Sequence, residues 1–276
     1  MTRQPQASVD GSAANAGAPL LEVSDMFKAY RGVIALDGVS MQVQRASITG
    51  LIGPNGSGKS TLFDCITGFQ AKDRGRVRLD GQDISALAPQ AIARKGVRRT
   101  FQQLRFFPEL TVFDNLLVAA QSEPGFSYFS EIVGGARIRA HEAAMRARAA
   151  AILEEIRLAP QSDALGASLS YGQKKLMELG MALMTEPKLL MVDEPMAGVN
   201  PTLIEGLKQE LIKVRERGVA LLIVEHNLKL VFEICDWIYV LDRGRLLAQG
   251  KPQDVAHDER VVQAYLGHRA VESAID

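Results

Sequence analysis

Cysteine is scarce in this sequence, and long apolar runs and an excess of either charge are missing. The 276 residues include two cysteines, Cys65 and Cys235, which lie far apart and outside any C-x-x-C or metal-binding spacing. We interpret both as buried thiols in a reducing compartment. The 32 basic and 32 acidic residues balance. A general nucleic-acid surface usually shows a basic excess, so we expect no nucleic-acid partner.

The longest apolar runs are strand-sized. Leu189–Val192 and Val219–Val224 are far shorter than the ~20 residues that a bilayer-spanning helix needs. The N-terminus also lacks the charged-then-apolar pattern of a signal peptide. We therefore expect a soluble, cytoplasmic chain that would need another chain to supply a membrane span. Its length suits one large α/β domain or one domain with an inserted subdomain.

The order of patterns along the chain indicates the fold class. Residues 1–19 are rich in Ala, Gly, Ser and Gln and are interpreted as a disordered N-terminal tail. Strand patterns follow, then helical periodicity, and after Leu189 the two alternate. Continuous apolar strands beside amphipathic helices predict a parallel sheet covered on both faces, and hence an α/β fold.

Turn and cap signals place the individual elements. Asp80-Gly81 and Asp242-Arg243-Gly244 predict hairpin turns, and Thr111-Val-Phe-Asp114 resembles a capping box. Strands are expected at 20–23, 39–43, 47–52, 76–79, 189–192, 219–224, 237–241 and 245–248. Helices are expected at 62–69, 89–95, around 145–156, from Tyr171, and from Pro201 to Gly218, the last with Asn200 as its cap and an apolar stripe of Leu203, Leu207, Leu211 and Val214.

A glycine-rich loop is the clearest functional motif. It follows a buried strand and precedes a helix, as the P-loop pattern requires, and comprises Gly53, Pro54, Asn55, Gly56, Ser57, Gly58, Lys59, Ser60 and Thr61. Glycines let successive backbone N–H groups point at phosphate oxygens, and the helix N-terminus adds partial positive charge. Lys59 would face the β and γ phosphates of ATP, and the Ser60 hydroxyl can ligate Mg²⁺. The alternative is a glycine-rich turn with an exposed lysine, which the strand–loop–helix context disfavours.

Two carboxylates and a histidine follow later strands. Asp193 and Glu194 end the run that starts at Leu189, and ligands gather at the carboxyl ends of parallel strands. Asp193 is suited to hold Mg²⁺ through water, and Glu194 to orient the attacking water as general base. His226 follows the next strand and is interpreted as a γ-phosphate sensor. Taken alone, the carboxylates could serve as caps, and the histidine could be structural.

Together these residues resemble the ATP-binding cassette (ABC) ATPases over about Leu20 to Gly267. The most specific element is the run Leu-Ser-Tyr-Gly-Gln at 169–173, which looks like the ABC signature motif. The resemblance implies that Ser170 and the backbone of Gly172 and Gln173 form a second anion site, which serves the γ-phosphate bound by the opposite subunit. On its own, Ser170 would be interpreted as the N-cap of an amphipathic helix.

Other elements of the family follow the expected order. Tyr30 resembles the aromatic residue that stacks on adenine, although alone it would be taken for a core tyrosine. Gln102 matches the Q-loop glutamine that touches Mg²⁺ and relays to the membrane partner, and alone it would be taken for a surface glutamine. Residues 197–200 occupy the D-loop position, and His226 occupies that of the switch histidine.

Two departures from the common family pattern point to one branch. Tyr171 stands where many members have glycine, and Asn200 where many have aspartate. Both look like the branch that powers branched-chain amino-acid importers. Further similarities are the run from Arg99 to Gln103, the run from Glu225 to Asn227, and an insertion around 122–146. The chain resembles the larger of the two ATPase subunits of that branch, and importers for urea or short amides would look nearly the same.

The resemblance implies an architecture and an assembly. The fold would be a P-loop NTPase with a RecA-like core, an antiparallel β subdomain, an inserted α-helical subdomain at about 98–186, and a C-terminal tail at 268–276. A second ABC ATPase subunit, a paralogue, would face this chain head to tail around ATP and Mg²⁺. Two transmembrane permease subunits and, indirectly, an external solute-binding protein would complete a bacterial importer. The chain would then lie on the cytoplasmic face of the inner membrane.

Several alternatives stay open at this stage. Phe106, Phe107 and Leu110 could cover a groove for the permease or could be ordinary core. The chain could instead be a soluble, non-transport ABC ATPase acting on ribosomes or nucleic acid. It could also be an inactive regulatory cassette, although Lys59 and Glu194 are intact.

Overall fold

Two sheets organise the computed structural model, which describes residues 17–100, 106–120, 135–198 and 201–272. An antiparallel sheet has the strand order β2-β1-β4-β5, with β1 (Leu21–Tyr30), β2 (Val33–Val43), β4 (Arg74–Leu79) and β5 (Gln82–Asp83). A larger sheet has the order β10-β9-β3-β8-β7-β6, with β3 (Ile48–Ile52), β6 (Val97–Arg99), β7 (Leu189–Asp193), β8 (Ala220–Val224), β9 (Trp237–Asp242) and β10 (Arg245–Gly250). Its strands pair in parallel except for the β9–β10 hairpin.

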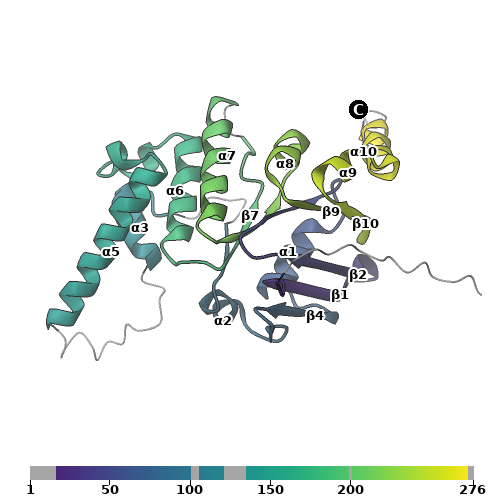
Figure 1. The fold of residues 1–276 in the computed structure, drawn as a ribbon, viewed down its shortest axis with the longest axis horizontal. Helices are drawn as coiled ribbons and strands as arrows, with labels where there is room; N and C mark the ends of the chain where they lie inside the picture. Colours follow the sequence, from purple (N-terminus) through teal and green to yellow (C-terminus); the bar gives the residue numbers. More distant parts are fainter. Residues whose placement is uncertain (1–16, 101–105, 121–134, 199–200, 273–276) are drawn as a thin grey trace, which may run out of the picture.

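Helices surround the larger sheet. They are α1 (Lys59–Thr67), α2 (Pro89–Arg94), α3 (Val112–Ala120), α5 (Gly135–Glu155), α6 (Tyr171–Leu183), α7 (Pro201–Glu216), α8 (Leu228–Ile234), α9 (Pro252–Ala256) and α10 (Glu259–Glu272). Helices α3, α5 and α6 pack on one another at one end of the molecule, away from the antiparallel sheet (Figure 1). Within the described ranges, no helix is both long and apolar enough to cross a bilayer.

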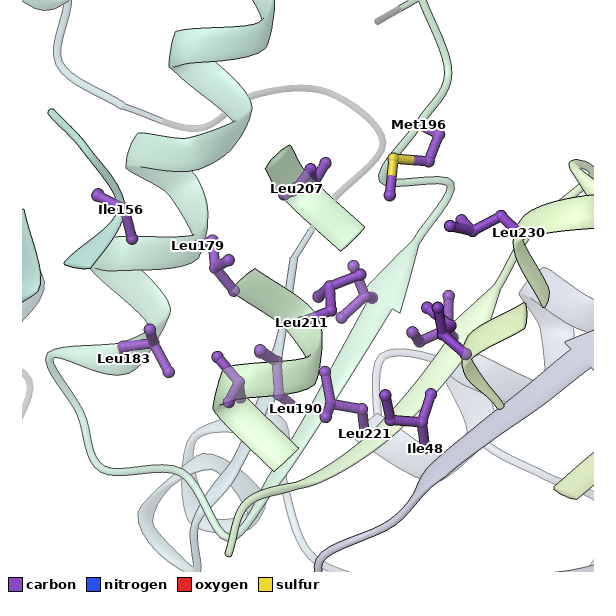
Figure 2. Close-up of a cluster of buried hydrophobic side chains, with 14 of the residues drawn as sticks. Ile48, Ile156, Leu179, Leu183, Leu190, Met196, Leu207, Leu211, Leu221 and Leu230 are labelled. Carbon is purple, nitrogen blue, oxygen red and sulfur yellow. The ribbon is translucent and has the colours of Figure 1, made fainter. Parts of the chain in front are cut away.

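The larger sheet separates two hydrophobic cores, because successive side chains of a strand point to opposite faces. Leu190 and Val192 of β7 join the helix-side core, which packs the sheet against α3, α5, α6, α7 and α8 (Figure 2). Leu189 and Met191 join the sheet-side core, which packs the other face against α1 and the antiparallel sheet. The predicted parallel sheet with two covered faces is therefore confirmed.

Most predicted turns and helix starts are present in the structure. Asp80 and Gly81 have φ of 55° and 74° and form the hairpin turn between β4 and β5. Thr111 caps α3 by accepting the Asp114 N–H at 3.0 Å. The Asp114 carboxylate accepts a hydrogen bond from the Thr111 hydroxyl at 2.7 Å, where a full capping box would use the backbone N–H.

One expectation needs a qualification. Leu203 was placed in the apolar stripe of α7, but it lies in the first turn of the helix and is 36% exposed, although its side chain comes close to Gly172 of α6. Helix α10 extends to Glu272, into the segment expected as a C-terminal tail, and the boundary of that tail stays a prediction. Its buried Val261 and partly buried Tyr265 pack on the helix-side core.

Other predictions fall outside the described residues. These are the tail up to residue 16, the part of the 122–146 insertion that lies before residue 135, and the single positions Gln102 and Asn200. They stay predictions.

Candidate active site

The predicted phosphate loop joins β3 to α1. Gly58 is the N-cap of α1, and no side chain caps the helix, which leaves its first N–H groups available to an anion. A Cβ on Gly53 would lie 2.1 Å from the Leu241 carbonyl oxygen, and one on Gly58 would lie 2.5 Å from that of Ala35. The glycines therefore let the β9 end and β2 pack directly against the loop. Asn55, Gly56 and Ser60 are exposed on its open side.

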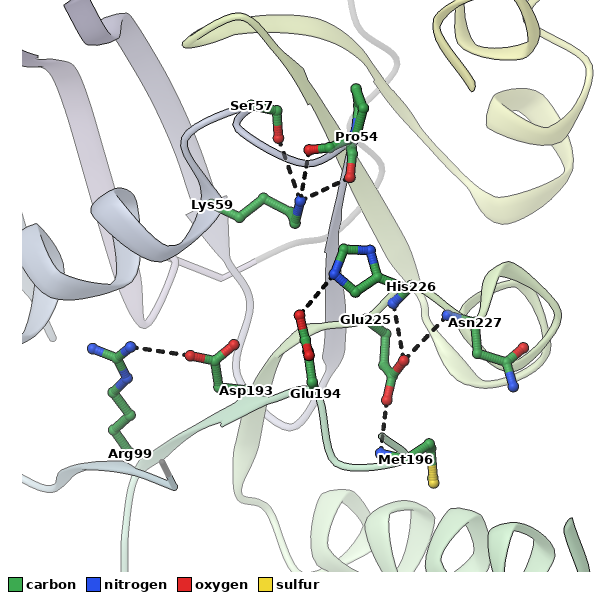
Figure 3. A network of polar contacts seen from close by, with 11 residues as sticks. Pro54, Ser57, Lys59, Arg99, Asp193, Glu194, Met196, Glu225, His226 and Asn227 are labelled. Carbon is green, nitrogen blue, oxygen red and sulfur yellow. Dashed lines mark hydrogen bonds and ion pairs between the residues drawn. The ribbon is translucent and has the colours of Figure 1, made fainter. Parts of the chain in front are cut away.

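Lys59 is folded back onto the loop. Its ammonium donates hydrogen bonds to the carbonyl oxygens of Gly53 at 2.8 Å and Pro54 at 2.9 Å, and its side chain is buried (Figure 3). Burial lowers the pKa of this ammonium, and the nearby charges of Glu194 and Asp193 act in the opposite direction. The lysine charge therefore already lies beside both predicted carboxylates. The three groups come from α1 and the end of β7, as a nucleotide site at strand ends requires.

Asp193 is held by an arginine that sequence reasoning named only as the start of a run resembling one branch of the family. The Arg99 guanidinium, at the end of β6, donates to the Asp193 carboxylate at 3.0 Å and also pairs with Asp64 of α1. Both side chains of the Asp193 pair are only 9% exposed. The Asp193 N–H donates to the Thr100 hydroxyl at 3.4 Å. That run does not indicate the contact with Asp193, since the contact depends on β6 pairing in parallel beside β7.

Glu194 and His226 are in direct contact. Their side chains meet at 2.7 Å, between Glu194 Oε1 and His226 Nε2 (Figure 3). Glu194 has a φ of 48°, in the left-handed region that non-glycine residues rarely adopt. Its N–H donates to the Val224 carbonyl oxygen at 2.9 Å, which fixes this turn against β8. The structure thus brings together the carboxylate and the histidine that were predicted from separate strand ends.

Ser170 is the N-cap of α6. Its hydroxyl accepts the Gln173 N–H at 3.3 Å, and the Gln173 side chain accepts the Ser170 N–H at 2.9 Å. This reciprocal pair is a capping box, so the N-cap interpretation is confirmed. Ser170 is exposed, and Gly172 is buried against Leu203 of α7. The start of α6 is thus exposed at Ser170, and the second anion site expected there stays a prediction.

Tyr30 lies at the tip of the β1–β2 hairpin and is 40% exposed, so it is not a core residue. The Lys28 ammonium is 5.2 Å from the centre of its ring. Val33 and Ile34 beside it are also exposed, at 69% and 51%. The next residue, Ala35, is the one whose carbonyl packs at Gly58. The hairpin tip therefore presents apolar surface next to the phosphate loop, which suits stacking of a base.

The available oxygen ligands fit Mg²⁺. This ion usually takes one or two protein ligands and completes its shell with water and phosphate oxygens. The Ser60 hydroxyl on α1 and the Asp193 carboxylate on β7 are ligands of this kind. Among the described residues, no three His, Cys, Asp or Glu side chains gather as a metal site. These residues therefore suit an ion that arrives together with phosphate, and Gln102 lies outside the described part of the chain.

Glu225 is another residue of this site, and the sequence analysis named it only in the run from Glu225 to Asn227 that resembles the importer branch. It lies between β8 and His226 and is 3% exposed. Its carboxylate accepts hydrogen bonds from backbone N–H groups on both sides of the site (Figure 3). The available signal was an acidic residue directly after a fully apolar strand and directly before the histidine.

Comparisons with known proteins agree with this geometry. The sequence model described as "ABC transporter" matches residues 36–197, and that described as "Branched-chain amino acid ATP-binding cassette transporter" matches residues 245–271. The high-affinity branched-chain amino acid transport ATP-binding protein BraF of Pseudomonas aeruginosa is 40% identical over 250 residues, covering 90% of this chain and 98% of that protein. The protein LivG of Escherichia coli, described in the same terms, is 38% identical with the same coverage.

The fold is similar to that of solved cassettes. A crystal structure of the ADP conformation of an ATP-binding cassette of an ABC transporter superposes with a TM-score of 0.79 at 36% identity. It covers 91% of this chain and 100% of the solved one. A phosphate loop, paired strand-end carboxylates, a facing histidine and a capped signature helix therefore occur here in a fold with known ATP-binding relatives. The chain belongs to the ABC transporter family and is an ATP-binding, ATP-hydrolysing subunit of that family.

Proposed function

We propose that the chain is the ATP-hydrolysing subunit of a bacterial importer for branched-chain amino acids or related small solutes such as amides and urea. The observation that carries this proposal is the 38–40% identity, along nearly the whole chain, to ATP-binding proteins of branched-chain amino-acid transport. The match of residues 245–271 to the branched-chain cassette supports it independently. Both favour an importer over a soluble ABC ATPase that acts on ribosomes or nucleic acid.

The residues of the site divide the work of hydrolysis. Tyr30 stacks on the adenine, and the P-loop backbone with Lys59 holds the phosphates. Ser60, Asp193 and Gln102 hold Mg²⁺, which neutralises phosphate charge when it is bound. Glu194 takes the proton of the attacking water, and its 2.7 Å contact with His226 fixes the carboxylate beside the γ-phosphate position.

A second ATPase subunit, a paralogue of this chain, completes each site. Ser170 and Tyr171 at the start of α6 are exposed, and α6 is not the helix that follows the P-loop, so this helix start suits a γ-phosphate held by the facing subunit. In this arrangement the chain is the larger of the two ATPase subunits. Alone, it hydrolyses ATP slowly because its own P-loop holds only half of a site.

Force reaches the membrane through the helical subdomain, roughly residues 98–186. ATP-driven closure moves α3, α5 and α6, and the stretch from Gln102 to Asn115 passes this motion to two permease subunits. Phe107 is 51% exposed and is the side chain of the predicted aromatic group best placed for such a contact. Phe106 packs partly on the helix-side core instead. The chain thus works on the cytoplasmic face of the inner membrane, and an external solute-binding protein is a partner only indirectly.

The test is reconstitution of the chain with its genomically neighbouring permeases and second cassette in proteoliposomes. We expect ATP-dependent uptake of radiolabelled leucine, isoleucine or valine, and loss of uptake with Glu194→Gln. Uptake of urea or acetamide alone would redirect the solute assignment. ATP hydrolysis without uptake of any of these solutes would contradict the importer proposal, and no hydrolysis in the assembled complex would favour an inactive regulatory cassette.

A further inference from the structure

The buried carboxylate of Glu225 connects two loops that carry the proposed catalytic pair. Its Oε1 accepts the Met196 N–H at 2.8 Å, and Met196 lies two residues after Glu194. Its Oε2 accepts the His226 N–H at 2.9 Å and the Asn227 N–H at 3.2 Å. One side chain therefore holds both the loop that leaves β7 and the loop that leaves β8 (Figure 3).

Burial of the Glu225 carboxylate costs free energy, and the hydrogen bonds that offset this cost also fix the geometry of the two loops. Glu225 is only 3% exposed, so its carboxylate has lost most of its hydration. Three backbone N–H groups compensate that loss, and hydrogen bonds to an ionised acceptor are shorter and stronger than neutral ones. Because both oxygens are engaged, the carboxylate cannot rotate without releasing one of the two loops.

We propose that Glu225 is a positioning residue, which sets the distance between Glu194 and His226 by tying their loops together. The Glu194–His226 contact at 2.7 Å joins side chains from two different strand ends. The left-handed backbone of Glu194, with φ of 48°, is fixed at its own N–H by Val224, and it also needs support at the residues that follow. Glu225 supplies that support at Met196 while it fixes the start of the histidine loop.

Two substitutions of Glu225 separate the possible contributions. Glu225→Gln keeps the shape but replaces one acceptor oxygen with an NH₂ group, so one of the two loops loses its acceptor. Glu225→Asp keeps the charge and both oxygens but is one methylene shorter, so it cannot reach both loops. A matched control is Glu210→Gln on α7, since Glu210 is a glutamate of similar burial, at 2% exposed, that pairs with Lys213 instead.

The inference rests on the proposed roles of Glu194 and His226, and the experiment measures kcat and KM for ATP in the full-length chain, alone and in the assembled transporter. We expect both Glu225 variants to lose about 10- to 100-fold in kcat, the scale of loss that a small misplacement of reacting groups causes, with KM for ATP unchanged. In a Glu194→Gln background, Glu225→Gln should have no further effect, because the group that it positions is gone.

Each other outcome has a definite meaning. A raised KM, or an equal loss of kcat in Glu210→Gln, would indicate general loosening and overturn the inference. Additive losses in the double variant would overturn it as well. If Glu194→Gln loses turnover while both Glu225 variants retain it, only this inference fails, whereas turnover in Glu194→Gln itself would overturn the proposed roles on which it rests. If Glu225→Gln does not fold, Glu225→Asp carries the same test.

Discussion

At the scale of single residues, the site contains a buried charge and a strained backbone, and each lowers the stability of the fold. Lys59 is buried with its charge on two loop carbonyls, and Glu194 adopts a left-handed backbone. Strain and buried charge persist only where the surroundings fix them. Here Val224, His226 and the P-loop backbone provide the fixing contacts.

Substitution of Glu194 tests its role as general base. We expect Glu194→Gln to keep ATP binding and to slow turnover by roughly 10²–10⁴-fold, the usual contribution of a general base. ATP titration and steady-state hydrolysis in the assembled complex measure the two effects separately. Near-wild-type turnover would contradict the assignment.

Substitution of Lys59 tests the phosphate contact. Lys59→Ala should weaken ATP affinity by about 10- to 100-fold, since a charged hydrogen-bonding group contributes roughly 1.5–3 kcal/mol. Equilibrium titration with a fluorescent ATP analogue measures this, and Lys251→Ala, at an exposed lysine outside the loop, serves as control. Unchanged affinity in Lys59→Ala would count against the P-loop role.

Much of the site could be predicted at this scale, because the P-loop and strand-end motifs carry their chemistry in their residue types. Arg99 and the bridging role of Glu225 could not. Arg99 acts on Asp193 only because β6 pairs beside β7, and Glu225 acts on Met196 across a gap of 29 positions in sequence. Such contacts depend on strand order, which periodicity does not specify.

At the scale of elements, the start of α6 serves both stability and function. Its capping box uses the same Ser170 hydroxyl and Gln173 N–H that the proposed second anion site needs. A γ-phosphate from the facing subunit would therefore compete with an intrahelical bond. A serine before an amphipathic helix predicts the cap, whereas the anion site is predicted only by the resemblance to the ABC signature motif.

Ser170 variants separate the two roles. Ser170→Ala should lower the free energy of unfolding by about 1 kcal/mol through loss of the cap, whereas Ser170→Gly should cost only a few tenths. Both should reduce hydrolysis in the assembled complex similarly, because both lack the hydroxyl. Urea unfolding and ATPase assays measure these effects. Hydrolysis that follows stability, with Gly close to wild type, would contradict a role in binding phosphate.

The Asp80 turn predicts an acid-dependent contribution to stability. Hydrogen bonds from Arg45 and Lys188 lower the pKa of Asp80 from 3.8 to about 2. A lowered carboxylate pKa stabilises the fold above the unfolded value, and the contribution fades as pH falls from about 4 towards 2. The urea midpoint of Asp80→Asn should therefore lie below wild type at pH 5 and converge with it at lower pH.

Salt provides the control for this prediction. Asp80 is exposed at the surface, so 1 M NaCl should shrink the difference at pH 5 through screening. Asparagine tolerates the left-handed turn position and keeps the hairpin, so the backbone is not a confounding factor. A difference that is independent of both pH and salt would contradict the ion-pair explanation.

At the scale of the whole molecule, the larger sheet divides the interior into the sheet-side and helix-side cores. The two-faced sheet was predictable from continuous apolar strands. The helices α8 to α10 after His226 were not predicted, because they are short or weakly amphipathic and their packing decides their extent. The resemblance to the ABC ATPases nevertheless predicted which motifs surround the nucleotide.

The two cysteines report on the two cores separately. Cys65 belongs to the sheet-side core and Cys235 to the helix-side core. Burial raises the pKa of Cys65 to about 11, and that of Cys235 rises further, so few thiolates form at pH 8. We expect single-thiol variants to react slowly with a maleimide when folded and rapidly in urea. ATP should protect Cys65, on the helix after the P-loop, more than Cys235; equal protection would contradict separate cores.

The division of the interior into two cores also affects which parts of such a subunit can change independently during evolution. The sheet-side core supports the helix that follows the phosphate loop, while the helix-side core supports α3, α5 and α6. A change of volume on one face of the sheet need not be transmitted to the other. If α3, α5 and α6 contact the permease as proposed, their surface can change for a new permease without a change in the residues that bind the phosphates.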